Sequence, residues 1–502
     1  MTGWAAAPVP GRALSAGQLS AASPPGYRES VKVPTGGARR APAARPGPAT
    51  ASLKDLDISR PWAVRTAWIG LAVAVLLIVI ASIVYKPLDF SVYRWGGQEV
   101  THGLRLYLTR FVEGHNLEWF TYPPFSAILF VPVAGLPAVL GQVGWQLLSI
   151  VALASASVST LKLAGYRPSR TVIAAVVVGS ITLEPIYHTL YLGQINIILL
   201  ALILFDVWRA AQGRPAGIGV GLAAAIKLTP LIFIALFLIG RRTKDAVIAA
   251  ATFIACGLIG YLVAPKASGL YWHHLFFDTN RVGATYISNQ SPYAIVLRVA
   301  GPNAHIGHWY LVIPALLGII GLAVAAVLAR HNDWLGAATV TGTTGLLVSP
   351  ISWTHHWVWI LPALVILVQG GKRSRIAAGC AYVLFVVAPM WFTPRKGGPE
   401  EYGFHWLVTL VANCYLIAGL AFLGYMAWRA YVIRGGGTSA HTATVSTTPA
   451  ATEHGADRNA AGAARGAGAA RGAGAARGAR TTGGAGAAGG ADAPSSNPVR
   501  DL

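Results

Sequence analysis

Long apolar runs separated by short polar segments occupy most of the chain between residues 66 and 429. The first run, 66–85, has about the 20 residues that a helix needs to cross a bilayer. Further runs follow at 124–140, 143–162, 171–190, 195–210, 216–240, 244–263, 309–330, 335–349, 356–370, 375–392 and 405–429. This pattern predicts an all-α, polytopic integral membrane protein with about twelve transmembrane helices.

The two ends of the chain differ from this middle part. Residues 1–65 and 431–502 are rich in Ala, Gly, Pro and Arg and have no apolar periodicity. A six-residue repeat in the second segment places Arg465, Arg471 and Arg477 at equal spacing. Such segments hold too little apolar mass to fold alone. We expect a disordered basic cytoplasmic tail over 1–65, a transmembrane domain over 66–430 and a disordered low-complexity cytoplasmic tail over 431–502.

Composition supports the membrane class. Only 11% of the 502 residues are charged, against roughly 25% in soluble proteins. The net charge of +21 comes almost equally from the tails, 1–65 and 429–502, and from the middle. No dense basic stripe is present, so we expect contact with membrane lipid and no nucleic-acid partner.

Basic clusters between the runs set the expected topology. Positive charges before residue 66 place the N-terminus in the cytoplasm, and residues 241–244 and 371–375 mark later cytoplasmic loops. The loops 86–123 and 264–308 then lie outside, and their aromatic content favours ordered structure. Arginines between 167 and 214 do not fit this topology, because counting the spans from the N-terminus places them outside. Either a segment within 124–240 is re-entrant, or the charge rule is broken there.

The first candidate site follows the first apolar run. Asp89 stands about four residues beyond the expected helix end, and Tyr93 and Arg94 come directly after it. Tyr122 precedes two prolines at the start of the second run. A carboxylate here can reach both an aqueous acceptor and a lipid headgroup. The simpler alternatives are an acid that marks the interface and a tyrosine of the aromatic belt.

Three later patterns also carry polar groups into apolar surroundings. Gln194 and Asn196 flank the start of one run, where they either cap a helix or bond between helices. Lys227 lies within another run, and an intramembrane lysine either binds an anion such as phosphate or extends its ammonium to the interface. The third pattern, Ser-Pro-Ile-Ser-Trp-Thr-His-His, holds Trp353, His355 and His356.

Adjacent histidines on a helix point apart, so we expect no metal site at His355 and His356. One of them is a candidate hydrogen-bond donor or proton carrier. The alternative is an aromatic belt at the membrane interface that happens to contain histidine.

Taken in order along one polytopic chain, these motifs resemble a known family. Asp-x-x-Val-Tyr-Arg, Tyr-Pro-Pro, Gly-Gln-x-Asn, Lys-x-x-Pro and Ser-Pro-x-Ser-Trp-x-His-His are similar to motifs of actinobacterial polyprenyl-phosphate-sugar-dependent glycosyltransferases of the GT-C superfamily. Within it, the chain resembles the α-(1→2) mannosyltransferases of phosphatidylinositol mannoside and lipoarabinomannan synthesis. The resemblance covers about residues 60–430.

The resemblance implies a GT-C glycosyltransferase fold and an inverting transfer of mannose from polyprenyl phosphate mannose to a glycolipid acceptor. The reaction would take place on the extracytoplasmic side of the plasma membrane. Asp89 matches the family's catalytic aspartate, which near its usual pKa of ~3.9 would be ionised and ready to accept a proton. Lys227 would stabilise the donor phosphate, and His355 or His356 would assist. Contacts to the sugar or phosphate would come from Tyr93, Arg94, Tyr122, Gln194, Asn196 and Trp353.

Two other functions stay open at this point. The same family includes arabinofuranosyltransferases that use polyprenyl phosphate arabinose. A multi-spanning transporter or lipid flippase with intramembrane Glu184 and Lys227 is the alternative from a different class. Because the activated sugar arrives on lipid and no acidic pair suited to Mg²⁺ is evident, we expect no cofactor and no metal.

Overall fold

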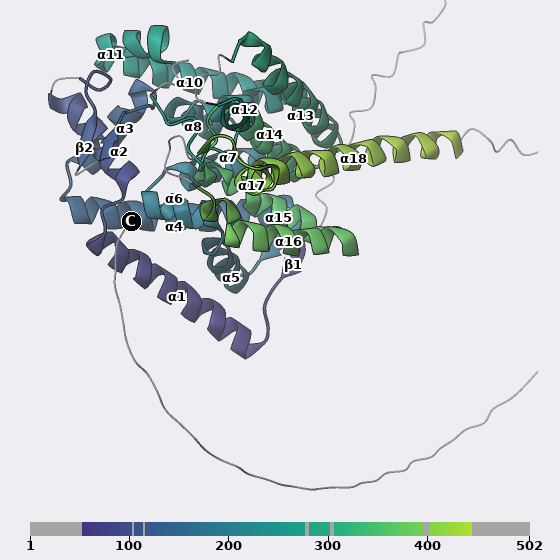
Figure 1. The fold of residues 1–502 in the computed structure, drawn as a ribbon. Coiled ribbons are helices and arrows are strands. Elements are labelled where there is room, and N and C mark those ends of the chain that lie inside the picture. Colours follow the sequence, from purple (N-terminus) through teal and green to yellow (C-terminus); the bar gives the residue numbers. More distant parts are fainter. Residues whose placement is uncertain are drawn as a thin grey trace, which may run out of the picture. The chain divides into compact units, whose positions relative to one another are not determined.

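The computed structural model describes residues 53–102, 105–113, 116–276, 281–301, 306–394 and 401–443. Within them the chain is mainly helical (Figure 1). The tail residues 1–52 and 444–502, including the arginine repeat, lie outside the described residues, as do Gly103 and Leu104. The first half holds α1 (Pro61–Val84), α2 (Leu88–His102), α3 (Pro124–Ala134), α4 (Ala138–Leu163), α5 (Arg170–Ile181), α6 (Glu184–Leu192), α7 (Asn196–Ala211) and α8 (Ile218–Ile226).

The second half alternates longer helices with single 3₁₀ or π turns. Its α-helices are α9 (Ile232–Ile239), α10 (Thr243–Val263), α11 (Pro265–Leu270), α12 (Pro292–Ala300), α13 (Val312–Arg330), α14 (Trp334–Val348), α15 (Ile360–Gln369), α16 (Lys372–Val387), α17 (Trp406–Ala412) and α18 (Cys414–Ala443). Its short turns are η1 (Thr229–Leu231), η2 (Tyr271–Leu275), η3 (His308–Leu311), η4 (Thr354–Trp359) and η5 (Pro389–Phe392).

Two small sheets join these helices. Strand β1 (Lys54–Leu56) pairs in parallel with β4 (Tyr166–Pro168), in a register that sets Lys54 opposite Tyr166. Strands β2 (Phe111–Glu113) and β3 (Asn116–Glu118) form an antiparallel hairpin after α2. The segment expected to be disordered up to residue 65 therefore holds a strand and the first turn of α1. Main-chain pairing to residues 166–168 orders it despite its polar composition.

Five helices are long and apolar enough to span a bilayer: Pro61–Val84, Ala138–Leu163, Thr243–Val263, His308–Arg330 and Cys414–Gly435. The pair α5 and α6 adds a sixth if its two parts, bent by 80°, count as one span. This bend falls inside 124–240, the segment in which the arginines do not fit the topology predicted from the sequence. The chain is thus a polytopic helical membrane protein, and the figure of twelve spans stays a prediction.

Several predicted runs form two short helices because proline or a turn interrupts them. The run 216–240 divides into α8, η1 and α9, with Pro230 in η1. Two predicted boundaries also move. Helix α1 begins at Pro61 rather than at residue 66, because proline suits the first helical turn. Helix α18 continues to Ala443, beyond the expected end at 430.

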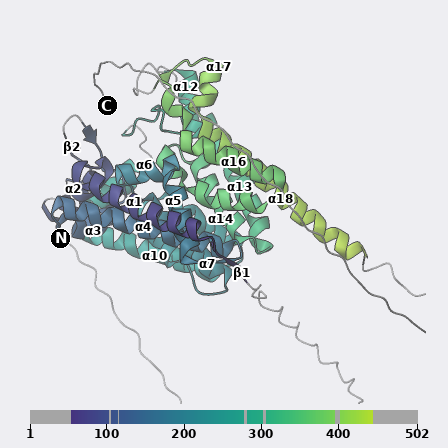
Figure 2. The same ribbon diagram turned by 90° about the horizontal axis from the view of Figure 1, so that it is seen from below.

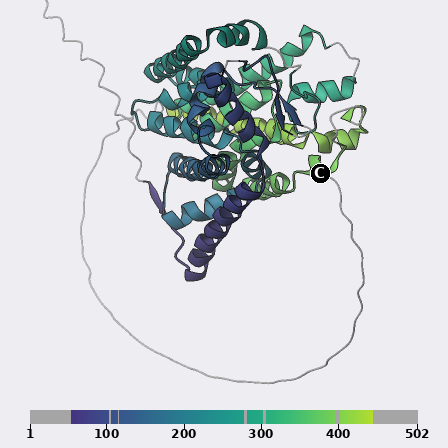
Figure 3. The ribbon, with the colours of Figure 1, turned by 90° about the vertical axis from the view of Figure 1, so that its left-hand side faces the viewer.

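Helix α1 contacts α4 and α5 (Figure 2). It lies at the edge of the helices (Figure 3), and in its most apolar stretch only 11% of the residues are buried. Exposed apolar side chains such as Leu76 and Ile80 are expected on a helix that faces lipid. The core lies instead among α4, α7, α8, α14 and the short helices that connect them.

The described residues of both predicted extracytoplasmic loops hold helices, turns or strands, as their aromatic content predicts. In the described part of the second loop, Arg298 is 1% exposed. Its guanidinium donates to the carbonyls of Thr285, Tyr286 and Asn289 and to Oδ1 of Asn413, at 2.7–3.0 Å. One buried cation thereby fixes residues 285–289 against α17 and α18.

Replacing Arg298 with leucine removes the donor from all four acceptors, and only the Tyr286 carbonyl keeps another one, the N–H of Asn289. We expect Arg298→Leu to lower the free energy of unfolding by about 3 kcal/mol or more. The measurement is the thermal unfolding midpoint of the purified protein in detergent. Arg434→Leu, on an exposed arginine of α18, is the control and leaves the midpoint unchanged. Equal midpoints for both variants would contradict this account of the loop.

Candidate functional site

The first site residue, Asp89, lies on a helix rather than in the loop expected from the sequence. It occupies the first turn of α2, where a carboxylate is favoured by the helix dipole. Tyr93 follows one turn later and is fully buried on the same face. This i, i+4 spacing directs Asp89 and Tyr93 towards the same neighbours.

Arg94 belongs to a different face of α2. Its Nη1 donates to the carbonyls of Val133, at 3.0 Å, and Leu136, at 2.8 Å. These carbonyls belong to the end of α3 and the residues just after it, where unpaired acceptors need donors. The structure therefore does not bring Arg94 together with Asp89, and the expected role of Arg94 in binding phosphate stays a prediction.

The turn between α6 and α7 approaches Asp89's helix closely. Gly193 ends α6 in the left-handed conformation, with φ +69°, which suits glycine. A Cβ atom at this position would lie 2.6 Å from Cβ of Phe90. The glycine of the Gly-Gln-x-Asn motif thus allows the turn to rest on α2, which brings Gln194 beside the first site residues.

Gln194 connects Asp89 with two tyrosines. Its Oε1 accepts hydrogen bonds from the hydroxyls of Tyr93, at 2.8 Å, and Tyr122, at 3.2 Å. Because the amide oxygen is occupied, the amide nitrogen is free to donate to Asp89, and the side chains of Gln194 and Asp89 are hydrogen-bonded. The orientation of this amide is therefore set by the tyrosines.

Burial raises the pKa of Asp89 from 3.8 to about 6. The hydrogen bond from Gln194 and the charges of Lys227 and His188 act in the opposite direction. A carboxylate at this pKa is mostly ionised at neutral pH and is a stronger proton acceptor than an exposed aspartate.

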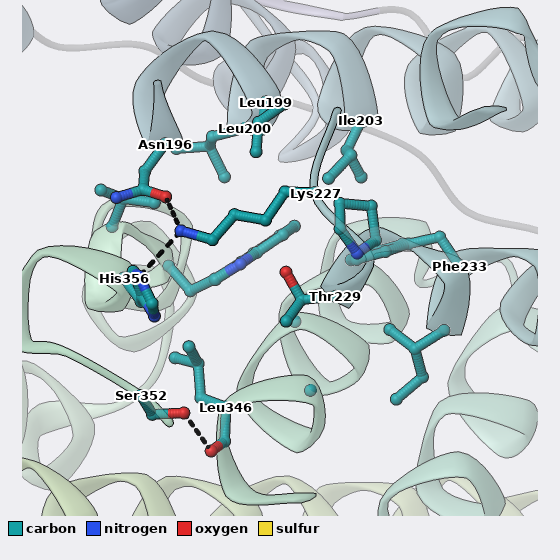
Figure 4. Close-up of a pocket in the computed structure, with 16 residues that line it drawn as sticks. Asn196, Leu199, Leu200, Ile203, Lys227, Thr229, Phe233, Leu346, Ser352 and His356 are labelled. Carbon is teal, nitrogen blue, oxygen red and sulfur yellow. Dashed lines mark hydrogen bonds between the residues drawn. The ribbon is translucent and has the colours of Figure 1, made fainter. Parts of the chain in front are cut away.

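Lys227 lies at the break between α8 and η1, in an extended conformation. Pro230 cannot donate the main-chain hydrogen bond that would continue α8. The ammonium donates to Oδ1 of Asn196, at 3.0 Å, and to Nε2 of His356, at 2.8 Å (Figure 4). An ammonium has only donors, so Nε2 of His356 is the acceptor. The ring of Tyr122 also lies 5.7 Å from Nζ.

A small cavity of about 50 Å³ adjoins this lysine. Polar side chains such as Lys227, His356 and Thr229 line it together with apolar ones such as Leu200 and Phe233 (Figure 4). A lining that combines one cation with hydrocarbon side chains suits part of an amphipathic anion.

His355 is held through its main chain. Its carbonyl accepts hydrogen bonds from Oγ1 of Thr189, at 3.0 Å, and Nδ2 of Asn196, at 2.9 Å. Its imidazole is buried, and neither ring nitrogen has a hydrogen-bond partner within the described part of the chain. Buried polar atoms are nearly always paired, so this ring is a candidate contact for a bound ligand.

The rings of His355 and His356 are almost perpendicular, at 88°, and have different surroundings. The ring centroids are only 4.7 Å apart, so the two side chains meet edge to face and do not point apart as expected. The expectation assumed an α-helix, whereas the residues lie in the 3₁₀ segment η4. Trp353 is not part of the cluster: its main chain bridges to Asn289, and its ring lies against Tyr286.

Sequence reasoning named Glu184 only as an intramembrane acid of the alternative transporter, and it missed His188 and the pairing of these two residues on α6. Nδ1 of His188 lies 2.9 Å from Oε1 of Glu184 and 2.9 Å from Oγ1 of Thr354. Glu184 also accepts from Nε1 of Trp391 and the hydroxyl of Tyr415. An acid and a histidine four residues apart on an apolar helix would have been the signal.

Chemically, the arrangement pairs a proton acceptor with a cation. Asp89 and Lys227 are connected through Gln194 and Tyr122, and no ion pair joins them among the described residues. Within that same part of the chain, no group of three or more His, Cys, Asp or Glu side chains could hold a metal ion. The site can take up a proton at one end and stabilise an anion at the other.

Comparison with known proteins gives consistent matches. Residues 120–350 match the model of glycosyltransferase family 87. The chain is 33% identical, over 62% of its length and 78% of the relative's, to a polyprenol-phosphate-mannose-dependent α-(1-2)-phosphatidylinositol mannoside mannosyltransferase of Mycobacterium tuberculosis. It is 32% identical to a polyprenol-phosphate-mannose-dependent α-(1-2)-phosphatidylinositol pentamannoside mannosyltransferase of Mycolicibacterium smegmatis, over 62% of the chain and 77% of the relative. No solved structure matches the chain.

The hydrogen bonds around Glu184 give a prediction for this part of the site. Glu184→Gln replaces an acceptor of three hydrogen bonds by a neutral amide, one of whose atoms can only donate. We expect a loss of about 2 kcal/mol in the free energy of unfolding, measured as a lower thermal midpoint in detergent. Asp57→Asn, on an exposed acid before α1, is the control. A midpoint for Glu184→Gln equal to that of the control would show that the hydrogen bonds to Glu184 do not stabilise the fold.

Proposed function

The chain belongs to glycosyltransferase family 87, and we propose that it transfers mannose from polyprenyl phosphate mannose to a phosphatidylinositol mannoside. The linkage formed is α-(1→2), as in the names of its relatives. The observation that carries the proposal is the convergence of Asp89, Lys227 and the two histidines on one cluster. A lipid-linked donor needs both a proton acceptor and an anion site, and this cluster supplies them together.

Inversion at the sugar's anomeric carbon requires a single displacement. The acceptor hydroxyl oxygen attacks the anomeric carbon while Asp89 takes the hydroxyl proton. The bond between that carbon and the phosphate oxygen breaks, and its electron pair leaves with polyprenyl phosphate. Lys227 stabilises the charge that develops on the phosphate, in a site largely closed to water.

Other residues orient the reactants. Gln194, fixed by Tyr93 and Tyr122, holds the Asp89 carboxylate in position. His356 and Asn196 hold the Lys227 ammonium. The unpartnered imidazole of His355 donates to or accepts from a sugar hydroxyl. The apolar side chains of the adjoining cavity, Leu200, Ile203 and Phe233, contact the hydrocarbon that follows the phosphate.

The finer features of the fold form part of the same proposal. A GT-C architecture accounts for a polytopic chain whose reactive acid lies on a short helix after the first span. An extracytoplasmic site follows from the charge pattern, which places residues 86–123 outside. The acceptor is a glycolipid that shares the bilayer with the donor, so both substrates reach the site from the membrane.

Two alternatives receive less support. An arabinose donor would use the same chemistry, but the relatives that match this chain carry the names of mannosyltransferases. A proton-coupled transporter could also use an acid and a cation in one site. The names of the relatives, all of them mannosyltransferases among those that match here, favour an enzyme over a carrier.

Removing the proton acceptor tests the proposal directly. Asp89→Asn keeps the shape of the side chain but cannot accept the proton, so we expect mannose transfer to fall by about 10²-fold or more. The assay uses membranes of matched expression, radiolabelled polyprenyl phosphate mannose and phosphatidylinositol mannosides. Glu99→Gln, on the same helix, is the control and retains activity. Undiminished transfer by Asp89→Asn would remove Asp89 from this role.

The raised pKa of Asp89 predicts the pH dependence. The base must be ionised, so activity rises with pH, is half-maximal near pH 6 and is lost below it. Gln194→Leu removes the hydrogen bond that lowers this pKa, and the midpoint should move to higher pH. A profile with its acidic limb near pH 4, or one that Gln194→Leu does not shift, would contradict the assignment.

A further inference from the structure

A second and larger cavity lies between α15, α16 and α18. Figure 1 shows the three helices near one another, and α16 and α18 also lie side by side in Figure 2. Its volume is about 800 Å³, within the range of roughly 300–1,000 Å³ typical of ligand sites. Most of its lining is apolar, with side chains such as Ile360, Leu384 and Phe422. Because α18 contains a candidate span and α16 exposes Ile376 and Val383, this cavity borders lipid. A hydrocarbon chain is the occupant that suits such a lining.

One end of the cavity is polar and basic. Lys372, Arg373 and Ser374 line it together with Gly371, and the two basic side chains are exposed. Gly371 is also the N-cap of α16 and contributes no capping side chain. The main-chain N–H groups of the first turn and the helix dipole therefore add to the two positive charges. Such a combination favours a phosphate group.

A third feature of the cavity is Trp357. This residue lines the cavity and is 4% exposed, and its indole Nε1 has no hydrogen-bond partner among the described residues. Buried indole N–H groups usually find an acceptor. The wall of the cavity therefore holds one donor that the described residues do not satisfy.

We propose that this cavity binds one anionic phospholipid, with an acyl chain in the apolar part and the phosphate at the N-terminus of α16. The site is separate from Lys227, and residues 371–375 are predicted to face the cytoplasm. The bound lipid is therefore a resident lipid and neither donor nor acceptor. Trp359 lines both cavities and stacks on Phe233, with ring centroids 5.2 Å apart. The lipid thus contacts η4, the segment that carries His355 and His356.

The test measures bound lipid on the full chain and does not depend on mannose transfer. Protein in nanodiscs of phosphatidylcholine with a minor fraction of phosphatidylglycerol is released into detergent, and retained lipids are counted by native mass spectrometry. Wild type should retain one phosphatidylglycerol. The exposed double variant Lys372→Gln/Arg373→Gln should weaken this retention about tenfold or more, while Ala381→Trp, which fills the apolar part, should abolish retention of either lipid.

Matched controls decide between the possible outcomes. Lys244→Gln/Arg434→Gln removes the same charge from exposed positions outside the cavity and should behave as wild type. Inorganic phosphate added in excess should not displace the lipid. Retention by the Lys372→Gln/Arg373→Gln variant equal to that of wild type would overturn the proposal. So would displacement by phosphate alone, which would indicate a free-anion site.

Discussion

The structure depends on holding one ammonium group away from bulk water. Lys227 lies in a run of apolar residues, where an unpaired charge is costly, and the chain meets this constraint by breaking the helix at that residue. The break directs Nζ towards Asn196 and His356. Asn196 can reach it because α7 starts directly after the Gly193 turn, and His356 can because η4 is a short 3₁₀ segment rather than a continuous helix. The interruptions in the transmembrane pattern are thus the means by which the site is built.

The same geometry keeps the Asp89 carboxylate and the Lys227 ammonium apart. If Asp89 and Lys227 formed a direct ion pair, neither would be available to a substrate. Gln194 and Tyr122 lie between them, which leaves the carboxylate hydrogen-bonded but able to accept a proton. The turn that carries Gln194 rests on α2 only because Gly193 has no side chain. A conformational requirement at one glycine is therefore coupled to the protonation chemistry of a residue more than a hundred positions earlier.

Much of the site follows from the sequence because its motifs are local and polar groups in apolar runs are conspicuous. Asp89, Tyr93, Tyr122, Gln194, Asn196, Lys227 and the two histidines all enter one cluster. Arg94 does not, because it lies on another face of α2 and donates to a carbonyl at the end of α3. Trp353 does not either, because its ring packs against Tyr286. Glu184 and His188 join from a helix whose bend at residues 182–183 hydropathy alone does not reveal. Hydropathy alone also does not predict the number of spans, because Pro230 and the turns divide apolar runs that are continuous in the sequence.

The most direct test of the account is a structure of the chain bound to polyprenyl phosphate mannose in a form that cannot transfer its sugar. The account predicts the phosphate beside the Lys227 ammonium and the anomeric carbon on the side facing Asp89. His355 would lie within hydrogen-bond distance of a sugar hydroxyl. A donor whose phosphate lies elsewhere, with Lys227 still bound only to Asn196 and His356, would contradict the assignment of this cluster as the reaction centre.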